Sequence, residues 1–380
     1  MIKPFRILDW WLNRKRRSTP RPGTARGVLL ISSGGLGDTV LFAHVAGRFV
    51  RLAEKDEPVT VALRSDAMKM AFLLPAGVRG LGVDFDRLRR DLGYRRRVTD
   101  DIFKAHYRLV VHTDYLRHPD LDEALVAAAQ APEAVAMEPR PWPKYDARLG
   151  QNRRLYGRLY DSGDPRLDKV VRWSRFADWL SGAEESPPPV ALLPGERLPP
   201  AETAEAADDP FVVMQPFSAV RQKQSPPALY RRLIESLPSA TRVVITGTRS
   251  DLDANGEFKT LLDLPGVTFD DRVFENLVPM LRGARLVVSV DTALMHLAAA
   301  VGAPTLCLAS AAYVGEIVPY DPAITPPNAR FVHHSMPCEG CLGDCVLPAE
   351  NGMFPCVAAL DEDQILAAAA DILAASGETE

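Results

Sequence analysis

A candidate catalytic aspartate follows a glycine-rich turn in the segment Ser32–Val40, SSGGLGDTV. The glycines Gly34, Gly35 and Gly37 let the backbone turn sharply and approach a ligand, because they carry no Cβ. Asp38 stands in the first turn of the helix expected next, where free N–H groups and the helix dipole stabilise a carboxylate. Two roles fit it: a helix cap, or a general base that takes a proton from an incoming hydroxyl. The turn matches neither the GxGxxG fingerprint nor the P-loop.

A second candidate site lies in residues 287–305, VVSVDTALMHLAAAVGAPT. Asp291 and Thr292 follow an apolar strand and begin a helix that Gly302 is expected to end. The free N–H groups at the start of such a helix suit a diphosphate. His296 lies one turn after Thr292 on the same face. It either faces the ligand or is a core histidine hydrogen-bonded to the backbone.

A third candidate, residues 215–230, is a loop between an apolar strand and a helix that Pro226 and Pro227 announce. This loop carries Arg221 and Lys223. Cations at the carboxyl end of a strand would stabilise a departing phosphate group. The alternative is a solvated basic pair with no role in chemistry.

Four of the five cysteines fall within 19 residues: Cys338, Cys341, Cys345 and Cys356. The spacing CxxC-x3-C-x10-C suits a tetrahedral zinc or iron ion. Free thiols or a disulfide are the alternative, because the second spacing is not a paired CxxC. A metal held here would be structural, since four thiolates leave no open position. The fifth, Cys307, is expected in a buried strand.

These motifs stand at the ends of strands in two successive α/β sets. We expect an α/β domain at residues 27–185, a Pro-rich and then acidic linker at 186–209, a second domain at 210–360 and a final helix at 361–380. Strands are predicted at 27–33, 58–65, 107–114, 211–217, 241–247, 285–290 and 304–310. The fold class is therefore two doubly wound, Rossmann-like domains, whose ligands bind at the carboxyl ends of the strands in the cleft between them.

The composition is that of a soluble globular protein, with 380 residues, 47% hydrophobic, 25% charged and a net charge of −4. This charge disfavours nucleic acid as a partner, and neither a membrane span nor a signal peptide is predicted. Residues 1–26 differ, with eight Lys/Arg against Asp9 and with Trp10 and Trp11 among them. This segment either lies on an anionic membrane surface or packs on its own domain as a solvated tail.

Taken in their order along the chain, the glycine turn, the lysine loop and the segment at Asp291 resemble the ADP-heptose heptosyltransferase family of inverting GT-B glycosyltransferases. The family's glycine turn corresponds to GGLGD, and its Lys-x-x-Pro loop to Lys223–Pro226. Its Asp-Ser/Thr-Gly-x-x-His-Leu segment corresponds to Asp291–Leu297. Two positions depart from the family pattern: Ala293 replaces its glycine, and Ser225 replaces its frequent tryptophan.

The resemblance implies a role for each matched residue. Asp38 would be the catalytic base, and Lys223 would contact the phosphate or leaving group. Thr292 and the backbone of Ala293 would hold the diphosphate. The stretch TGTRSD would place Asp251 near the ribose hydroxyls; the further nucleotide contacts expected are Arg221, Gly247, Asp291 and His296.

The function implied is inverting transfer of a heptose from ADP-heptose to a hydroxyl of lipopolysaccharide core or a related glycan. The first domain would take the acceptor and the second the nucleotide sugar, with no metal required for chemistry. A protein acceptor is the alternative, because the related enzymes that modify autotransporters use a four-cysteine iron-binding finger. The polar stretch His112–His118 borders the acceptor or is an ordinary loop. Such an enzyme would be cytoplasmic, with peripheral contact at the inner face of the membrane through residues 1–26.

Two rival classes remain. One is an oxidoreductase with a nicotinamide cofactor, which the missing GxGxxG disfavours. The other is a non-catalytic GT-B nucleotide-binding module, which Ala293 favours and which Asp38 and Lys223 disfavour.

Overall fold

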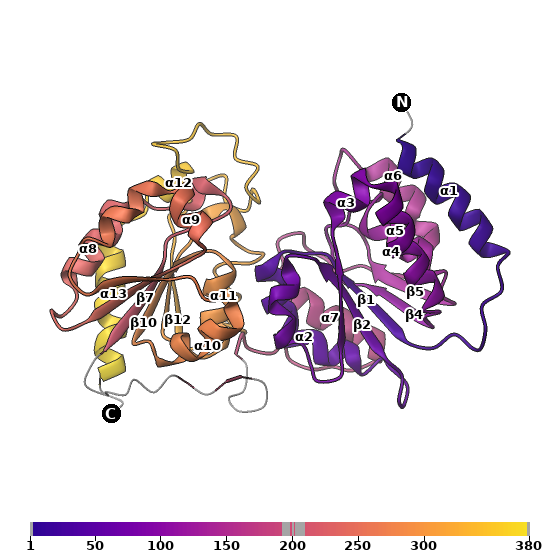
Figure 1. Cartoon of the computed structure of the whole chain (residues 1–380), viewed down its shortest axis with the longest axis horizontal. Helices are drawn as coiled ribbons and strands as arrows, with labels where there is room; N and C mark the ends of the chain where they lie inside the picture. The colour runs from indigo at the N-terminus through magenta and orange to yellow at the C-terminus, as the bar shows by residue number, and fades with distance from the viewer. Residues whose placement is uncertain (1–2, 192–197, 200, 202–209, 378–380) are drawn as a thin grey trace. The chain divides into compact units, whose positions relative to one another are not determined.

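The computed structural model describes residues 3–191, 198–199, 201 and 210–377. The chain divides into two compact units, one of Met1–Pro165 with Arg172–Ser186 and one of Arg166–Val171 with Pro187–Glu380. Each unit contains one parallel six-stranded sheet with helices packed against it (Figure 1). The prediction of two doubly wound α/β domains is confirmed. Much of the predicted linker at 186–209 lies outside the described residues.

The sheet of the first unit has the strand order β3-β2-β1-β4-β5-β6. Its strands are β1 Val28–Ser32, β2 Val59–Arg64, β3 Arg79–Val83, β4 Leu109–His112, β5 Glu133–Met137 and β6 Arg158–Tyr160. Its helices are α1 Pro4–Arg17, α2 Leu36–Val50, α3 Phe85–Arg90, α4 Leu92–Lys104, α5 Asp122–Ala129 and α6 Asp146–Asn152, and α7 Lys169–Ser181 follows. Short 3-10 helices cover Ala67–Leu73 and Arg153–Leu155.

The central strands of this sheet are mostly apolar and largely buried, with polar residues such as Ser32 and His112 at their carboxyl ends. All five residues of β1 are buried, as expected for a parallel strand between two helical layers. Leu88 of α3, Ile102 of α4 and Leu125 of α5 share one core with β1 and β4. Helices α2 and α7 meet through aromatic contacts, in which Phe42 packs edge-on against Trp173.

The sheet of the second unit has the order β12-β11-β10-β7-β8-β9. Its strands are β7 Phe211–Gln215, β8 Arg242–Thr246, β9 Val267–Asp270, β10 Leu286–Val290, β11 Thr305–Leu308 and β12 Ala329–Val332. Its helices are α8 Pro227–Ser236, α9 Arg249–Ala254, α10 Phe274–Gly283, α11 Ala293–Ala300, α12 Pro355–Ala358 and α13 Glu362–Gly377. Short 3-10 helices cover Arg221–Lys223, Gly256–Leu261 and Ala311–Tyr313.

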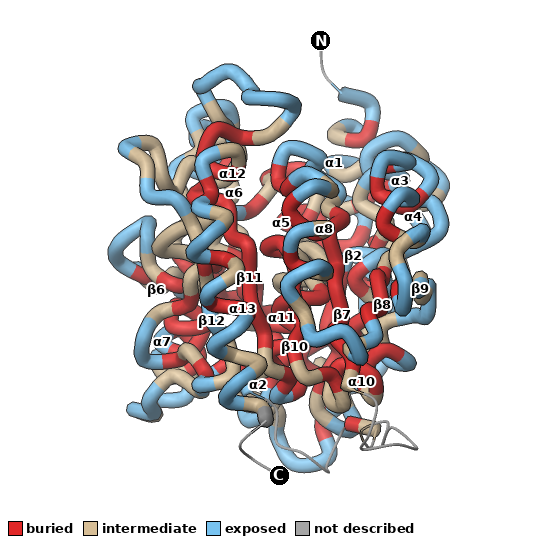
Figure 2. Tube along the Cα trace, turned by 90° about the vertical axis from the view of Figure 1, so that its left-hand side faces the viewer, coloured by how far each residue is buried: buried red, intermediate tan, exposed pale blue. Residues whose placement is uncertain are grey.

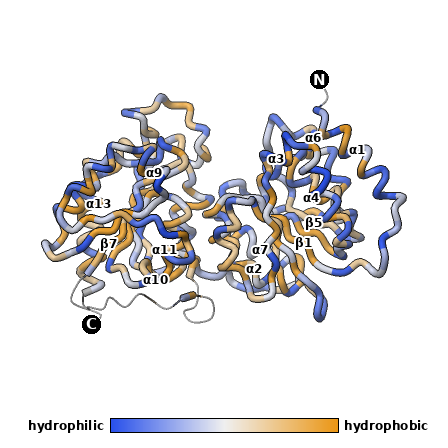
Figure 3. The backbone as a smooth tube through the Cα atoms, viewed as in Figure 1, coloured by the Kyte–Doolittle hydropathy of each residue, from blue (hydrophilic) through white to orange (hydrophobic). Residues whose placement is uncertain are grey.

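The core of the second unit lies on its central strands. Strands β7, β10 and β11 are buried (Figure 2), and hydrophobic residues concentrate along the strands (Figure 3). Residues of α8, α9, α12 and α13 share one cluster with them. After β8 the chain forms α9, which ends at Ala254, and then the 3-10 helix Gly256–Leu261, with Asn255 between them.

Both sheets reverse their strand order at one place. In the first unit the reversal falls between β1 and β4, which are neighbours, and in the second between β7 and β10. Ligands of open α/β sheets bind outside the carboxyl ends of the strands at such a switch point. The glycine turn follows β1, the lysine loop follows β7 and Asp291 follows β10, so the candidate residues stand at the two switch points.

No helix in the part of the chain that the structure describes combines the length and the apolar character needed to cross a membrane.

Candidate functional site

Asp38 lies in the first turn of α2, and its side chain hydrogen-bonds back to the glycine turn that precedes this helix. Its Oδ2 accepts a hydrogen bond of 2.7 Å from the backbone N–H of Gly35, the residue that precedes the helix. The turn requires glycine at Gly34, because a Cβ there would lie 2.5 Å from the Cβ of Asp38. The side chain is only partly buried. The capping role therefore exists in the structure, and the role of general base stays a prediction.

A buried polar cluster that was not predicted adjoins this turn. Ser33 donates from its hydroxyl to Asp114 at 2.8 Å and to Asp122 at 3.1 Å, and its backbone N–H also donates to Asp114. His112, fully buried at the end of β4, lies 3.5 Å from Asp122 through Nε2. The cluster joins the turn after β1 to the loop after β4. In the sequence, the polar stretch His112–His118 marks the position of this cluster, but it does not indicate which residues would be its partners.

In the second unit, Lys223 joins the lysine loop to the turn that follows β10. Its Nζ lies 3.0 Å from Oδ1 of Asp291 and donates to the backbone carbonyl of Asp291 at 2.7 Å. Both side chains are buried. The hydroxyl of Ser310 donates to Oδ2 of Asp291 at 2.9 Å, and the ammonium lies over the ring of Tyr313. Burial raises the pKa of Asp291, and the charge of Lys223 opposes that shift.

Arg221, two residues before Lys223, lies elsewhere. It is exposed, pairs with Glu257 at 2.6 Å and donates to the carbonyl of Ala254. The structure therefore separates the two cations of the predicted loop, and only Lys223 contacts the turn at Asp291.

Thr292 and Ala293 form the start of α11, as expected. Thr292 precedes the helix in extended conformation, and its hydroxyl donates to Oε1 of Gln215 at the end of β7. Ala293 is the first helical residue. The helix ends before Gly302, which has a positive φ of 86°, so the predicted extent of this helix is confirmed. Binding of an anion by the N–H groups at this helix start stays a prediction.

His296 lies in the core of the second unit. It is 4% exposed, its Nδ1 is 2.7 Å from the hydroxyl of Tyr320, and the two rings stack. This position corresponds to the core alternative, although the partner is a side chain instead of backbone. A contact between His296 and a ligand stays a prediction.

Gly247 and Asp251 lie in the turn between β8 and α9. A Cβ at Gly247 would approach the ring of Phe217 to 2.6 Å, so only glycine fits. Asp251 caps α9, with Oδ2 accepting from the N–H and the hydroxyl of Thr248 at 2.9 and 2.6 Å. The carboxylate is partly exposed at the carboxyl end of β8, where a ribose contact remains a prediction.

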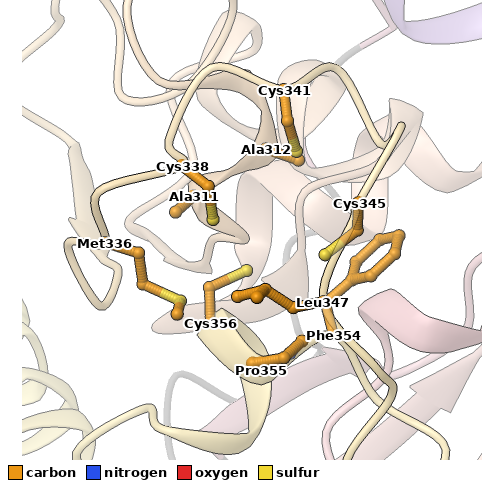
Figure 4. Close-up of a pocket in the computed structure, with 10 residues that line it drawn as sticks. All are labelled: Ala311, Ala312, Met336, Cys338, Cys341, Cys345, Leu347, Phe354, Pro355 and Cys356. Atoms are coloured by element: carbon orange, nitrogen blue, oxygen red, sulfur yellow. The ribbon is translucent and has the colours of Figure 1, made fainter.

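The four clustered cysteines surround one small cavity (Figure 4). Its volume is ≈ 10 Å³, about the space of one water-sized sphere. Burial raises the pKa of the Cys356 thiol, and Cys341 and Cys345 are close enough to raise it further. All five cysteines are free thiols. The other residues that line the cavity are Ala311, Ala312, Met336, Leu347, Phe354 and Pro355.

The donor set of this cavity is chemically suited to a thiophilic metal, because four sulfurs point to one space. Within the described ranges, however, no three His, Cys, Asp or Glu side chains are arranged to hold a metal ion. The structure therefore gathers the predicted ligands without forming a finished coordination shell. Cys307 is buried in β11, as predicted.

The two parallel α/β domains have the fold of GT-B-like heptosyltransferase structures. Residues 161–335 match the family model of glycosyltransferase family 9 (heptosyltransferase). This segment of the chain is therefore similar to glycosyltransferase family 9.

Solved structures of similar fold span nearly the whole chain. The ADP-heptose lipopolysaccharide heptosyltransferase II of Escherichia coli has a TM-score of 0.63 and 15% identity, covering 92% of this chain and 99% of that one. A family 9 glycosyl transferase of Veillonella parvula has a TM-score of 0.65 and 14% identity, with coverage of 93% and 98%. The iron-containing dodecameric glycosyltransferase TibC of enterotoxigenic E. coli has a TM-score of 0.52 and 15% identity, with coverage of 94% and 78%. No curated protein sequence matched.

Proposed function

We propose that the protein is an inverting glycosyltransferase that moves a heptose from ADP-heptose to a hydroxyl of lipopolysaccharide core or a related glycan. The observation that carries this proposal is the ion pair of Lys223 and Asp291. It joins the loop after β7 to the start of α11 at a switch point inside the segment that matches family 9. The first unit would bind the acceptor and the second the nucleotide sugar.

The reaction follows from the proposed roles. Asp38 removes the proton of the acceptor hydroxyl, and the oxygen attacks the anomeric carbon from the face opposite the diphosphate. The bond from that carbon to the diphosphate oxygen breaks, so the configuration inverts. N–H groups at Thr292 and Ala293 stabilise the charge on the departing diphosphate. These groups supply the stabilisation without a metal ion.

Lys223 has a more specific role in this proposal than a simple phosphate contact. Its charge is buried and paired with Asp291. Its main role is therefore to fix the turn that positions the N–H groups at the start of α11. Direct contact between its ammonium and the diphosphate remains part of the prediction. Gln215 supports the same turn through Thr292.

The donor nucleotide is tested by calorimetric titration with ADP, UDP, GDP and NAD in parallel. We expect selective binding of ADP, weakened about tenfold in Asp251→Ala, since loss of one hydrogen bond to a charged group costs about 1.5 kcal/mol or more. Asp253→Ala is the matched control, because Asp253 lies on the same helix and pairs with Lys259. A preference for UDP or GDP would remove heptose from the proposal, and tight binding of NAD alone would overturn it.

The cysteine cavity is proposed as a structural metal site for zinc or iron. Cys338, Cys341, Cys345 and Cys356 would hold the ion, which would fix the loop between β12 and α12 and take no part in transfer. We expect about one zinc or iron per chain by elemental analysis, lost in the Cys338→Ser/Cys341→Ser variant, with a lowered melting temperature. Cys307→Ala is the control and should keep the metal. If folded wild-type protein contained no metal and had five titratable thiols, this result would contradict the site.

Peripheral membrane contact through residues 1–26 is also proposed. Helix α1 is anchored on its own unit by Phe5, Leu12 and Arg16, which are buried. Arg6 bonds to Asp120 through Nε at 3.0 Å, and Arg95 pairs with Asp9. Helix α1 therefore packs on its own unit.

The outer face of α1 supports the membrane contact. Ile7, Trp10 and Trp11 are 58%, 63% and 49% exposed. Arg14 and Lys15 lie over the two indole rings. Exposed tryptophans flanked by cations suit the interface of an anionic bilayer.

Co-sedimentation with lipid vesicles tests this contact. We expect binding to vesicles of phosphatidylcholine with phosphatidylglycerol, little binding to phosphatidylcholine alone, and loss of binding in Trp10→Ser/Trp11→Ser. Val273→Ser is the control, because Val273 is as exposed (62%) but lies in the second unit, outside α1. Equal binding of the tryptophan variant and the wild type would contradict the proposed contact.

A protein acceptor is the second candidate, in place of a glycan. The four-cysteine cavity favours it, because the autotransporter-modifying relatives use a four-cysteine finger. Acceptor screening with ADP-heptose distinguishes the two.

A further inference from the structure

A cavity of ≈ 680 Å³ lies in the first unit at the carboxyl ends of its strands. Ser33 follows β1, Arg64 ends β2, Val83 ends β3, and residues 116–118 follow β4. The volume is within the range of small-molecule sites, about 300–1,000 Å³. This is also the edge of the sheet where a ligand is expected.

Three aromatic rings form one part of its wall. Trp142 and Tyr145 meet with ring centroids 4.5 Å apart, and Tyr145 lies at the same distance from His118. The backbone N–H of Trp142 donates to Asp146 at 2.6 Å, and its carbonyl accepts from the N–H of Tyr145. These bonds fix the backbone at Trp142, and its half-buried indole meets the rings of Tyr145 and His118 edge-on. Such a ring presents an apolar face with a polar edge, which matches a sugar ring, whose C–H groups face one side and whose hydroxyls point outward.

The charges that line the cavity do not favour an anion. Each of its guanidinium groups is already paired: Arg64 with Asp66 at 2.8 Å, Arg89 with Asp86 at 3.2 Å, and Arg117 with Glu123 at 3.0 Å. Burial lowers the pKa of His118, which favours its neutral imidazole. The lining carboxylates outnumber the guanidinium groups; they are Asp66, Asp84, Asp86 and Asp122.

The neighbouring cations are occupied as well. Arg6 and Arg148 bond to Asp120, in the loop that contributes His118 and Asp122 to the lining. Lys144 lies over the ring of Tyr145 at 5.2 Å and is not part of the lining. A phosphate or carboxylate on the ligand would therefore meet paired cations and additional negative charge.

Hydroxyl partners are present in the lining. Asp122 is buried, with Oδ1 accepting from the N–H of His118 at 2.8 Å and Oδ2 from the hydroxyl of Ser33 at 3.1 Å. The backbone N–H of Glu123 also donates to Oδ1 at 3.2 Å. A carboxylate has about four lone-pair positions, so one position, on Oδ2, is left to accept from a sugar hydroxyl. Ser33 precedes the glycine turn that carries Asp38.

We propose that this pocket binds an uncharged sugar ring of the acceptor, stacked on Trp142 and hydrogen-bonded to Asp122. Naming this sugar the acceptor depends on the proposed transferase function; its binding does not. The pocket selects a neutral, polyhydroxyl glycan over a phosphorylated or carboxylated one.

Ligand-observed NMR on the full chain tests the proposal with sugars that differ in charge. The probes are the methyl glycosides of glucose, galactose and heptose, with methyl glucuronide and glucose 6-phosphate as the anionic counterparts. We expect at least one neutral glycoside to bind about tenfold more tightly than both anions. Binding is expected to be lost in Trp142→Ala, retained in Trp142→Phe and unchanged in Trp179→Ala, a partly exposed tryptophan outside the lining.

Three results would overturn the proposal: no neutral glycoside binds, an anionic sugar binds as tightly as the neutral ones, or Trp142→Ala binds like the wild type. ADP titration of Trp142→Ala checks that the variant is folded and that the nucleotide site is intact. Sugar binding as expected with no transfer from ADP-heptose would retain the pocket and reject the transferase function. Transfer to an anionic acceptor would retain the function and reject the pocket's selectivity.

Discussion

Asp38→Asn is expected to lower kcat by about 10²–10⁴-fold, the usual contribution of a positioned general base, while ADP binds with unchanged affinity. The amide oxygen of asparagine can still accept the hydrogen bond from Gly35 that the carboxylate accepts now. The cap of α2 is therefore retained, and only the ability to take a proton is lost. Turnover of ADP-heptose and calorimetric titration with ADP measure the two effects separately.

The control for this variant is a capping aspartate that has no proposed role in chemistry. Asp91 precedes α4 and accepts from the N–H of Tyr94 at 2.9 Å, so Asp91→Asn changes a cap and should keep full turnover. Lost ADP affinity in folded Asp38→Asn would assign Asp38 to binding instead. Full turnover in Asp38→Asn would mean that Asp38 is a helix cap alone.

Lys223→Met is expected to destabilise the protein by about 3–5 kcal/mol, because it leaves the carboxylate of Asp291 buried without its cation. Both side chains are nearly inaccessible to water, 9% and 2% exposed. Adding Asp291→Asn should recover much of the loss, since it removes the unpaired charge. Chemical denaturation of the two variants and the wild type measures these differences.

Arg221→Met is the matched control, two residues away. Arg221 is exposed and its pair with Glu257 lies at the surface, where ion pairs contribute about 1 kcal/mol or less. If Lys223→Met were no less stable than Arg221→Met, the buried ion pair would have no role in fixing the turn before α11.

The strands at the centre of both sheets could be predicted from the sequence because they are buried on two faces and are therefore mostly apolar. Strands β3, β6, β9 and β12 were missed; they are the four edge strands of the two sheets. The sequence of β3, RGLGV, has two glycines, which weaken a strand pattern. Strand β6 has only three residues. Strand β5 (EAVAM) lies inside the sheet and was also missed, because alanine gives a weak strand signal.

The partners within the sites could not be predicted, because they depend on which strands are neighbours. Lys223 and Asp291 are 68 residues apart and meet because β10 pairs with β7 across the switch point. Asp114 and Ser33 meet for the same reason across β4 and β1. Local features were predictable: the cap at Asp38 and the end of α11 before Gly302 follow from residue type and position alone.

The most direct test of the account is transfer itself. The protein is incubated with ADP-heptose and a lipopolysaccharide core acceptor, ADP release is followed, and NMR assigns the anomeric configuration of the new bond. We expect ADP release that requires the acceptor, and a product whose anomeric configuration is opposite to that of the donor. Retention of configuration would contradict the single displacement assigned to Asp38. Absence of transfer to every glycan and protein acceptor, with ADP still bound, would contradict the enzyme and leave a nucleotide-binding module.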